Sequence, residues 1–505
     1  MTPLRIITDE VPDEYGTGRE KGLEIVPFTV TAMDRISPNF AVPPTPGPIT
    51  GDNLDETDLR PYQIEDVRLL ANRNVGVILS EPRTGKTPTA ILTFLTKGVK
   101  KYIVVAPASI LYQWSEEITR WSGASVVVPG GTVKKRHQMY KDWEDGVLVI
   151  SYETLRNDVE IILKTNKDIE GVILDEAHKI KNNKSLQYLA AYKLRKVKHK
   201  LALTGTLAPN KSHEVYGVLS FSYPQIFTGY WRFIYYYFET EERVRWVAGK
   251  KGQSFNDIGG LKHPTELQEF LERVAVRRTQ KEVMPWLPEK DYVKIRLDCT
   301  KDQKIAIEEM MEFFETGDVI AENLLTQLLR VRQICNAPQL LDLKGKSPKM
   351  EWIKQYIKDF PEKSIVIFSS FTSFLKLLKE EIPDSHLIIG ETKIAERNVL
   401  KNLFQKGKIK ILLVNTQAGK EGLTLDQASC AIFCDNYPPA SDIIQAENRI
   451  TATTEDKADK ENTIIKLMMK ETYDEALYDL VENNLEETDV INNFKQYLQQ
   501  RRKGQ

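Results

Sequence analysis

The segment EPRTGKT (81–87) carries residue types that suit the binding of nucleotide phosphates. It follows the apolar run NVGVILS (74–80), so a buried strand would end here and the next helix would open with free amides facing a phosphate. In that setting Lys86 would reach the β- and γ-phosphates, and the hydroxyl of Thr87 would bind Mg²⁺. Ser80 departs from the usual pattern GxxxxGKS/T, because it stands where the first glycine would be.

A second segment, LDEAHK (174–179), supplies the acidic residues that such a site needs. It also ends an apolar run, EGVILD (170–175), so Asp175 would hold Mg²⁺ from a second strand end. Glu176 would orient the attacking water, as acidic or amide groups do in phosphoryl transfer. His178 is better suited to couple the site to its neighbours than to bind a metal. Together the two segments predict a site for ATP and Mg²⁺.

Apolar, β-rich runs alternate with helical patterns from about residue 60 to 215. Such alternation is typical of a parallel sheet that helices cover on both faces. The predicted strands are NVGVILS, KYIVVAP, GVLVISY, GVILD and KLALTG, and the predicted helices include PTAILTFLTKG and ILYQWSEEITRW. Residues 211–345 break this pattern with aromatic, basic and helical stretches, and alternation then resumes with SIVIFSSFTSFLKLLKEEI, HLIIG, KIKILLVNTQAG and CAIFCDNYP. We therefore predict an α/β fold with two parallel-sheet units in tandem.

Two stretches within the interruption allow more than one interpretation. The aromatic run 223–239 is expected to be mostly core, with a nucleic-acid surface as the alternative. The segment RVRWVAGKKGQSF (243–255) has a turn signal between strand-like arms and predicts a hairpin. That hairpin could wedge open a duplex fork, or it could simply project into solvent.

The chain has 505 residues, a net charge of −1 and four cysteines. This length favours two to four domains, and the lack of a long apolar stretch or a signal pattern favours a cytoplasmic location, in a bacterial or phage-infected cell, without membrane contact. Cys430 and Cys434 are expected to be core thiols, because a second Cys/His pair is lacking nearby. Basic clusters at 131–141, 193–200 and 243–251 are each either a solvated face or part of a track for a phosphate backbone.

The order of the motifs resembles the Swi/Snf-type DNA-translocating ATPases of helicase superfamily 2, over roughly residues 56–480. LRPYQIEDVRLL is similar to the glutamine motif, EPRTGKT and DEAHKIKN to the first two ATPase motifs, VVAPASILYQW to a segment that touches the tracked strand, and LALTGTLAPN to the coupling motif. RRTQKEVMPWLPEK, LLRVRQICNAP, VIFSSF, LLVNTQAGKEGLTL and FCDNYPPASDIIQAENR resemble later family motifs in the expected order. The resemblance implies two RecA-like units that close on one ATP.

The resemblance also implies roles for the residues that match these motifs. Nucleotide contacts are implied for Arg60, Gln63, Thr84, Gly85, Lys86, Thr87, Gly422 and Arg449, with Thr87 and Asp175 as Mg²⁺ ligands and Lys86, Asp175, Glu176 and Arg449 in catalysis. Coupling is implied for His178, Thr204, Gly205, Thr206 and Gln445, and DNA contact for Pro107, Ser109, Trp114, Ser369, Thr416, Lys250 and Lys251. A polar cap is the alternative for Gln63, and an interdomain salt bridge is the alternative for Arg449. Packing is the alternative for Trp114, as for Trp121 and Trp143.

The chain departs from the family pattern at residues that bear on catalysis. Ala452 stands where the family usually carries a second arginine after Arg449, and Arg83 stands in the phosphate loop in place of the usual glycine. Either Arg449 suffices as the arginine finger or a cation from elsewhere compensates. These departures leave open a DNA-binding module that ATP gates with weak hydrolysis.

The predicted organisation has five parts: an N-terminal element and linker (1–52), a first unit (53–287) with an insertion at about 211–275, a helical protrusion and linker (288–345), a second unit (346–483) and a helical tail (484–505). The expected function is an ATP-dependent motor that tracks on duplex DNA and remodels or unwinds branched DNA at forks and junctions. The alternative within enzymes is a translocase that displaces proteins without unwinding. RNA unwinding is a further option.

Overall fold

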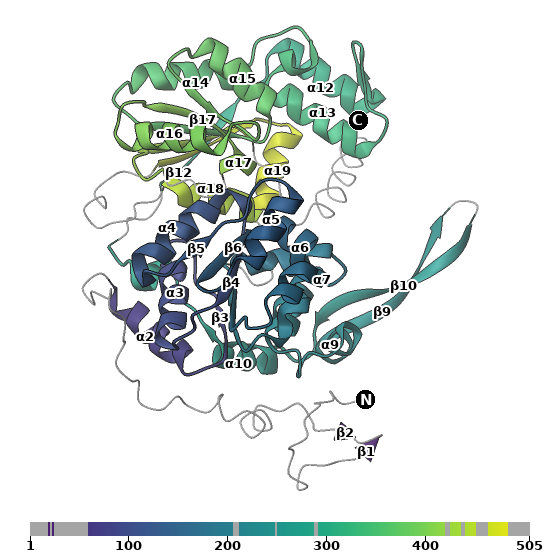
Figure 1. Ribbon diagram of the computed structural model, residues 1–505. Coiled ribbons are helices and arrows are strands. Elements are labelled where there is room, and N and C mark those ends of the chain that lie inside the picture. The colour runs from purple at the N-terminus through teal and green to yellow at the C-terminus, as the bar shows by residue number, and fades with distance from the viewer. Residues whose placement is uncertain are drawn as a thin grey trace. The chain divides into compact units, whose positions relative to one another are not determined.

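The computed structural model describes residues 19–20, 23–24, 59–205, 212–247, 250–286, 291–419, 425–435, 440–450 and 463–482. The chain divides into two compact units, Met1–Val283 and Met284–Gln505, each built around a parallel sheet (Figure 1). In the N-terminal element, the short strands β1 (Arg19–Glu20) and β2 (Leu23–Glu24) pair antiparallel. The α/β class and the tandem units predicted from the sequence are therefore confirmed.

The first unit contains a seven-stranded sheet in the order β11-β3-β8-β7-β4-β6-β5, and all its neighbouring strands run parallel. Its strands are β3 (Val75–Ile78), β4 (Tyr102–Ala106), β5 (Val126–Val127), β6 (Val147–Ser151), β7 (Gly171–Leu174), β8 (His199–Leu203) and β11 (Ala275–Val276). The five strands predicted for this unit are all present. The two additional strands, β5 and β11, are two residues long each, which is too short to leave a periodic pattern.

Alternate residues along each strand face opposite layers of helices, because side chains of a strand point to its two faces in turn. Val104 packs in the core under one layer, and Ile103 and Val105 pack in the core under the other. The first layer holds α2 (Pro61–Ala71), α3 (Lys86–Thr96) and α4 (Leu111–Ser122). The second holds α5 (Val133–Lys141), α6 (Tyr152–Thr165), α7 (Leu186–Lys193), α8 (Val215–Ser222), α9 (Tyr230–Tyr237) and α10 (Pro264–Val274).

The insertion in the first unit consists of α8, α9 and a long hairpin of β9 (Phe238–Val247) and β10 (Lys250–Leu261) (Figure 1). The pairing of Val247 with Lys250 and of Arg243 with Phe255 confirms the predicted hairpin. Its strands continue beyond the predicted arms to Phe238 and Leu261. Most of the aromatic run is core, as predicted, and the buried side chains are Tyr223, Phe227, Phe233, Tyr237 and Phe238.

The second unit contains a six-stranded sheet in the order β12-β19-β18-β15-β17-β16, again parallel throughout. Its strands are β12 (Asp291–Leu297), β15 (Ile365–Ser369), β16 (His386–Ile388), β17 (Ile411–Asn415), β18 (Cys430–Phe433) and β19 (Thr463–Met469). Residues 288–345 were expected to be a helical protrusion and linker, but β12 is an edge strand that pairs with β19. The expectation was wrong there because β12 is largely exposed and lacks the apolar character of the central strands.

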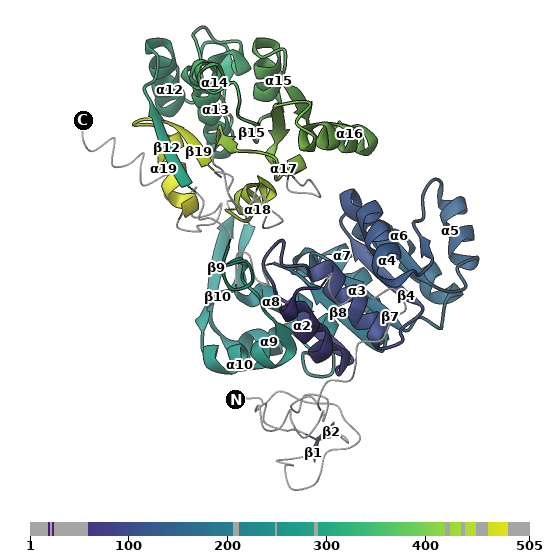
Figure 2. The ribbon, with the colours of Figure 1, turned by 90° about the vertical axis from the view of Figure 1, so that its left-hand side faces the viewer.

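Helices cover both faces of the second sheet (Figure 2). One face packs against α14 (Pro348–Asp359) and α15 (Thr372–Glu381), and the other packs against α16 (Ile394–Gln405) and α18 (Ala440–Ile450). A separate core joins α12 (Lys301–Phe313), α13 (Leu324–Asn336) and α19 (Tyr473–Glu482). Cys430 and Cys434 are buried in the core of the sheet, as expected. Among the described residues, no helix is both long and apolar enough to span a bilayer.

Candidate nucleotide site and strand-end network

The phosphate loop joins β3 to α3, and its backbone turns sharply before the helix begins. Gly85 precedes the helix with a φ of 77°, in the left-handed region that glycine tolerates. A Cβ atom at this position would lie 2.2 Å from the side-chain nitrogen of Gln63, so the side chain of Gln63 would have to move to make room for it. The ammonium of Lys86, at the start of α3, donates to the carbonyl oxygens of Ser80 at 2.9 Å and Glu81 at 3.0 Å. The lysine therefore lies within the loop, as the sequence predicted for a phosphate-binding residue.

The structure gives Ser80 a role that a glycine could not fill. Its buried hydroxyl accepts a hydrogen bond from the backbone N–H of Arg278 at 3.1 Å, and the N–H of Glu81 donates to the carbonyl of Arg278 at 2.9 Å. The side-chain amide of Gln280 donates to the carbonyl of Pro82 at 2.8 Å. The loop is thus fastened to the segment after β11. The family-like sequence RRTQ was the only signal for these residues, and no local rule assigned them to the loop.

Gln63 connects the first helix of the unit to the phosphate loop. Its side-chain oxygen accepts from the N–H of Arg60 at 3.0 Å, which caps the start of α2, and its amide nitrogen lies 3.4 Å from the carbonyl of Gly85. The neighbouring Tyr62, which the sequence reading missed, donates its hydroxyl to the carbonyl of Thr84 at 2.9 Å. The structure shows the capping alternative directly, and contact of Gln63 with adenine stays a prediction.

Asp175 follows β7 directly and is 7% exposed. One of its carboxylate oxygens accepts from the indole N–H of Trp114 at 2.8 Å, and the other accepts from the N–H of Glu176 at 2.9 Å. Burial, together with the nearby carboxylate of Glu176, raises the pKa of Asp175 to about 6. A carboxylate held in this way would gain a favourable partner if a cation bound beside it.

Two of the predicted coupling residues, His178 and Thr204, form a chain of contacts with Glu176 next to Asp175. Glu176 has a φ of 47°, a strained conformation for a residue with a side chain. Its carboxylate lies 3.3 Å from Nδ1 of His178, and the same nitrogen lies 3.2 Å from the hydroxyl of Thr204. Thr204 is fully buried at the end of β8, which lies between β3 and β7 in the sheet. A Cβ atom on Gly205 would lie 3.3 Å from the ring of Pro82 in the phosphate loop. The order of the strands therefore brings both predicted segments to one sheet edge.

Several residues predicted to contact DNA are buried. Trp114 is 1% exposed and holds Asp175, which supports the packing alternative and argues against direct DNA contact. Trp121 and Trp143 are also buried, as the packing interpretation requires. Pro107 is buried at the end of β4, whereas Ser109 is partly exposed. DNA contact by Ser109 stays a prediction.

Ser369 is fully buried, and its hydroxyl donates to Asp435 at 2.5 Å. A direct DNA contact by this hydroxyl is therefore wrong for the structure described, because Asp435 already engages it. Asp435 also accepts from the backbone N–H of Ser370 at 3.1 Å and from its hydroxyl. Thr416 is partly exposed at the start of α17 (Thr416–Gly419), so its DNA contact stays a prediction.

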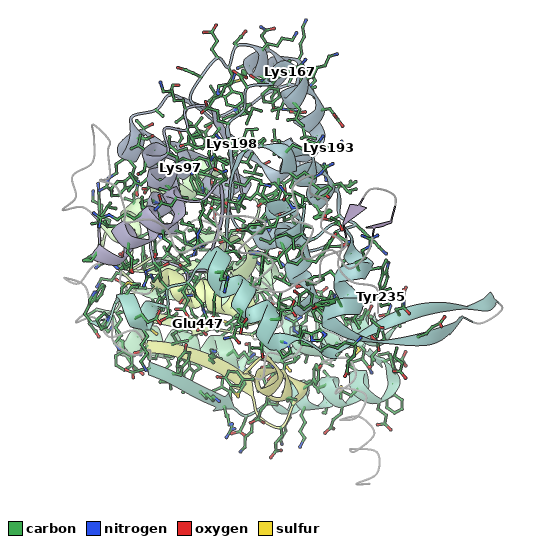
Figure 3. The ribbon with its side chains drawn as sticks, turned by 90° about the horizontal axis from the view of Figure 1, so that it is seen from below. Lys97, Lys167, Lys193, Lys198, Tyr235 and Glu447 are labelled. Atoms are coloured by element: carbon green, nitrogen blue, oxygen red, sulfur yellow. The ribbon has the colours of Figure 1, made fainter. Side chains whose placement is uncertain are left out.

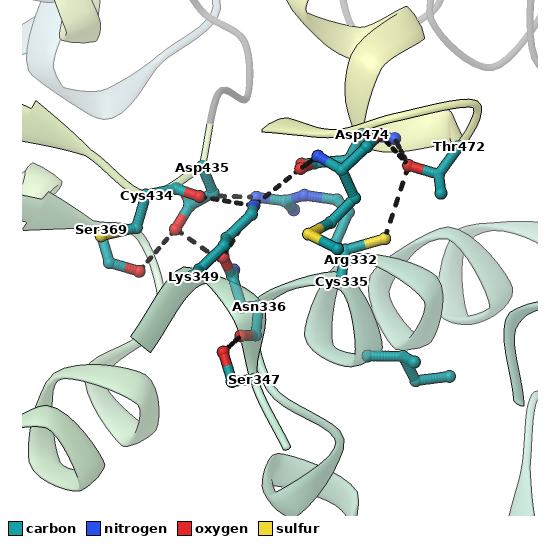
Figure 4. Close-up of polar contacts among 12 residues, drawn as sticks. Arg332, Cys335, Asn336, Ser347, Lys349, Ser369, Cys434, Asp435, Thr472 and Asp474 are labelled. Carbon is teal, nitrogen blue, oxygen red and sulfur yellow. Dashed lines mark hydrogen bonds and ion pairs between the residues drawn. The ribbon is translucent and has the colours of Figure 1, made fainter. Parts of the chain in front are cut away.

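A buried ion pair continues this network deeper into the second unit (Figure 4). The side-chain amide of Asn336, on α13, lies 3.4 Å from Asp435, and its oxygen accepts from the ammonium of Lys349 at 3.1 Å. Lys349 has no exposed surface, and it also donates to Asp474 and to the carbonyl of Cys434, both at 2.7 Å. Burial alone would lower the pKa of Lys349, but the adjacent Asp474 raises it overall. The sequence reading missed this network, because its members are spread over α13, α14, β18 and α19.

The basic cluster at 193–200 is partly structural. Lys200 is buried, and its ammonium donates to the carbonyls of Arg195 at 2.8 Å and Phe221 at 3.1 Å. Burial lowers the pKa of Lys200 to about 8. Lys193 is paired with Glu160, whereas Lys198 is exposed (Figure 3). The cluster lies at the start of β8, the opposite end of that strand from Thr204, so it does not border the predicted ATP site.

The remaining predicted residues fall in the second unit or outside the described side chains. Arg449 is partly exposed near the end of α18, and its carbonyl accepts from the N–H of Leu425 at 2.8 Å. Thr84 is buried in the phosphate loop, and Thr87 is partly exposed in the first turn of α3. Thr206, Gly422 and Ala452 lie outside the described residues, as do the side chains of Lys250, Lys251 and Gln445.

Comparison with known proteins covers both units. The model of the SNF2-related domain matches residues 62–340, which is more than half of the chain, and the model of the helicase conserved C-terminal domain matches residues 348–451. An uncharacterized ATP-dependent helicase, MG018 of Mycoplasma genitalium, is 25% identical over 453 residues, which cover 84% of this chain and 41% of that protein. The human DNA annealing helicase and endonuclease ZRANB3 is 26% identical over 409 residues, which cover 77% of this chain and 36% of that protein.

Among solved structures, the Sulfolobus solfataricus SWI2/SNF2 ATPase core in complex with dsDNA is similar to this chain. The two are 21% identical, with a TM-score of 0.41, over 87% of this chain and 93% of that chain. The chain spans about two fifths of the length of the curated relatives that it matches.

Proposed function

Because the chain belongs to the SNF2-related family of ATP-dependent helicases, we propose that it is an ATP-driven motor that tracks on duplex DNA and remodels or unwinds branched DNA. The observation that carries this proposal is the meeting of the phosphate loop, Asp175 and Thr204 at the ends of β3, β7 and β8. Those strands are neighbours, so a nucleotide held by the loop would be in reach of the coupling residues.

In this proposal, Lys86 moves from the carbonyls of Ser80 and Glu81 to the phosphates of ATP. The residues fit Mg²⁺, because Asp175 offers a buried carboxylate at a strand end and Thr87 offers a hydroxyl in the first turn of α3. When bound, the metal would neutralise charge that develops on the phosphates. Glu176 would orient the water that attacks the γ-phosphate.

The contacts among Glu176, His178 and Thr204 support a coupling role for these residues. Nδ1 of His178 lies 3.3 Å from the carboxylate of Glu176, which would orient the water, and 3.2 Å from the hydroxyl of Thr204, which follows β8. A shift of Glu176 on hydrolysis would alter the partner of His178, and through it the segment that follows Thr204. We propose that this chain transmits the state of the nucleotide toward the DNA-binding surface.

Arg449 is proposed as the arginine finger from the second unit. A cation that reaches the γ-phosphate only when the two units close on ATP would make hydrolysis depend on closure. The alternative is an interdomain salt bridge. Because Ala452 stands in place of the second arginine of the family, Arg449 would be the only arginine that this motif supplies to the γ-phosphate.

The long hairpin β9–β10 supports action at forks. The hairpin follows α9 directly in the chain, and in our proposal it separates the two strands of a duplex as the motor advances (Figure 1). The relative ZRANB3 is named a DNA annealing helicase, which agrees with a task on branched DNA. A hairpin that only projects into solvent is the alternative.

The test compares ATP hydrolysis with single-stranded, duplex, forked and four-way DNA, and measures strand separation and branch migration on the last two. We expect stimulation by duplex DNA and ATP-dependent strand separation at forks. Displacement of a bound protein without strand separation would instead identify a translocase. Undetectable phosphate release with every DNA would favour the ATP-gated binding module, which Arg83 and Ala452 motivate.

A further inference from the structure

Helix α9 presents two large aromatic side chains away from the core. Phe233, Ile234 and Tyr237 are buried against the first unit, whereas Trp231 is 43% exposed and Tyr235 is 52% exposed. The spacing of four residues places Trp231 and Tyr235 on one face of the helix. The other aromatic side chains of this helix belong to the core or pack against it, and this pair does not.

Contacts hold the pair in place without covering it. The two rings stack with centroids 5.7 Å apart and an interplanar angle of 28°. The rings of Tyr230 and Trp231 meet edge to face, with their centroids 5.4 Å apart. The side-chain amide of Asn256, on β10, donates to the hydroxyl of Tyr235 at 3.0 Å. Tyr235 lies at the root of the hairpin, as Figure 3 shows. The rings are therefore ordered before any ligand binds, which lowers the entropy lost on binding.

Charged side chains of both signs lie near the pair in the chain. Arg232 is exposed next to Trp231, and Lys262 is exposed with its ammonium 3.3 Å from the carbonyl of Tyr235. The acid Glu266 is engaged by the hydroxyls of Tyr236 and Tyr237 on another face of the helix. The acids Glu239, Glu241 and Glu242, on β9, are exposed, and Glu242 pairs across the hairpin with Asn256. Stacked aromatic faces beside two cations match the chemistry of a nucleic-acid base and its phosphates.

We propose that Trp231 and Tyr235 form a stacking platform for an unpaired base of single-stranded DNA at the root of the hairpin. The face of a base is free to stack on a side chain only where the duplex has been opened. The platform thus deepens the proposed function, since it would receive one of the strands that the hairpin separates. Arg232 and Lys262 would contact the phosphates on either side of that base.

The test uses the full chain and a labelled oligothymidine, with affinity measured by fluorescence anisotropy in the absence of ATP. Trp231→Ala and Tyr235→Ala should each weaken binding about tenfold, which is the usual effect of losing one stacking partner. Tyr235→Phe and Asn256→Ala should weaken binding much less than Trp231→Ala, because they remove only the hydrogen bond between Tyr235 and Asn256 and keep both rings. Phe313→Ala, which removes an exposed aromatic ring on α12, is the matched control and should also leave affinity unchanged.

Two outcomes would overturn the platform. One is unchanged affinity in Trp231→Ala. The other is an equal loss in Asn256→Ala and Trp231→Ala, because it would mean that the pair only anchors the hairpin. Duplex-stimulated ATP hydrolysis, measured on the same variants, separates this proposal from the motor itself: we expect it to stay intact when the platform is removed. Circular dichroism and thermal unfolding of each variant check that the chain as a whole is still folded.

Discussion

The raised pKa of Asp175 links the proposed binding of Mg²⁺ to pH. Its pKa rises from 3.8 to about 6 because the carboxyl is buried beside Glu176, yet binding of Mg²⁺ requires the ionised form. The folded chain holds this proton more tightly than the unfolded chain does. The resulting stabilisation is present below about pH 4 and is lost as the pH rises through about 6.

A nucleotide bound with Mg²⁺ should therefore stabilise the protein more at pH 7 than at pH 5.5. At the lower pH, binding must first remove the proton from Asp175, and that cost reduces the gain. Thermal unfolding with a non-hydrolysable ATP analogue, with and without Mg²⁺, measures the difference. An equal Mg²⁺-dependent shift at both pH values would contradict the assignment of Asp175 as a metal ligand.

Lys86→Ala should abolish ATP hydrolysis and leave DNA binding largely intact. The substitution removes the ammonium that donates to the carbonyls of Ser80 and Glu81 and that would bind the phosphates of ATP. It changes no residue that we expect to contact DNA. Phosphate release and DNA affinity are measured on the same preparation. Lys167→Ala, at an exposed turn ahead of β7, serves as the matched control, and normal turnover in Lys86→Ala would remove the site assignment.

At the scale of elements, the buried network ties helices α13, α14 and α19 to the ends of β15 and β18. Lys349→Met should destabilise the second unit by about 3–5 kcal/mol, because Asp474 would keep its charge in the interior without its partner. Urea-induced unfolding measures this loss. Lys354→Met is the control from the same helix: its pairs with Glu351 and Glu381 lie at the surface, and we expect a loss of about 0–1 kcal/mol.

Restoring neutrality gives a second check on the network. The double variant Lys349→Met with Asp474→Leu removes both charges and should recover much of the stability lost by Lys349→Met alone, since the interior would no longer hold an unpaired ion. Two losses that simply add would show that the pair acts through packing and not through charge.

Shortening residues 247–252 should reduce strand separation at forks more than DNA-stimulated ATP hydrolysis. This range includes Val247 and Lys250, which pair in the hairpin, and it is remote in sequence from the residues of the ATP site. Both rates are measured on one forked substrate. Equal losses in the two would mean that the hairpin is only structural.

At the scale of the whole molecule, we propose that hydrolysis in the first unit requires Arg449, a cation from the second unit. Arg449→Ala should retain ATP binding but lower the hydrolysis rate by about 10³-fold or more, the usual effect of losing an arginine finger. ATP affinity and single-turnover hydrolysis separate the two steps. Arg296→Ala, which removes an arginine paired with Glu475 in the same unit, is the control. Hydrolysis that persists without Arg449 would point to the salt-bridge alternative or to a compensating cation.

Local sequence patterns were enough to predict most strands of the two sheets and some of the helices, and with them the phosphate loop. The apolar run before Ser80 and the helix that begins at Lys86 each depend on neighbouring residues, so they can be read from a short window. The same holds for Asp175 at the end of β7 and for the hairpin, whose turn signal lies between its own arms. Family resemblance, and not periodicity, added the expected roles of Gln63 and Arg449.

Only the tertiary structure decided the contacts between residues that are far apart in the chain. The bond from Arg278 to Ser80, the burial of Trp114 against Asp175 and the place of β12 beside β19 leave no periodic signal in either partner. The sequence by itself determined where a phosphate loop and an acidic strand end would form. Their meeting at one edge depends on the order of strands in the sheet, which hydrogen bonds and packing between distant segments set, and no local window contains both partners of such a contact.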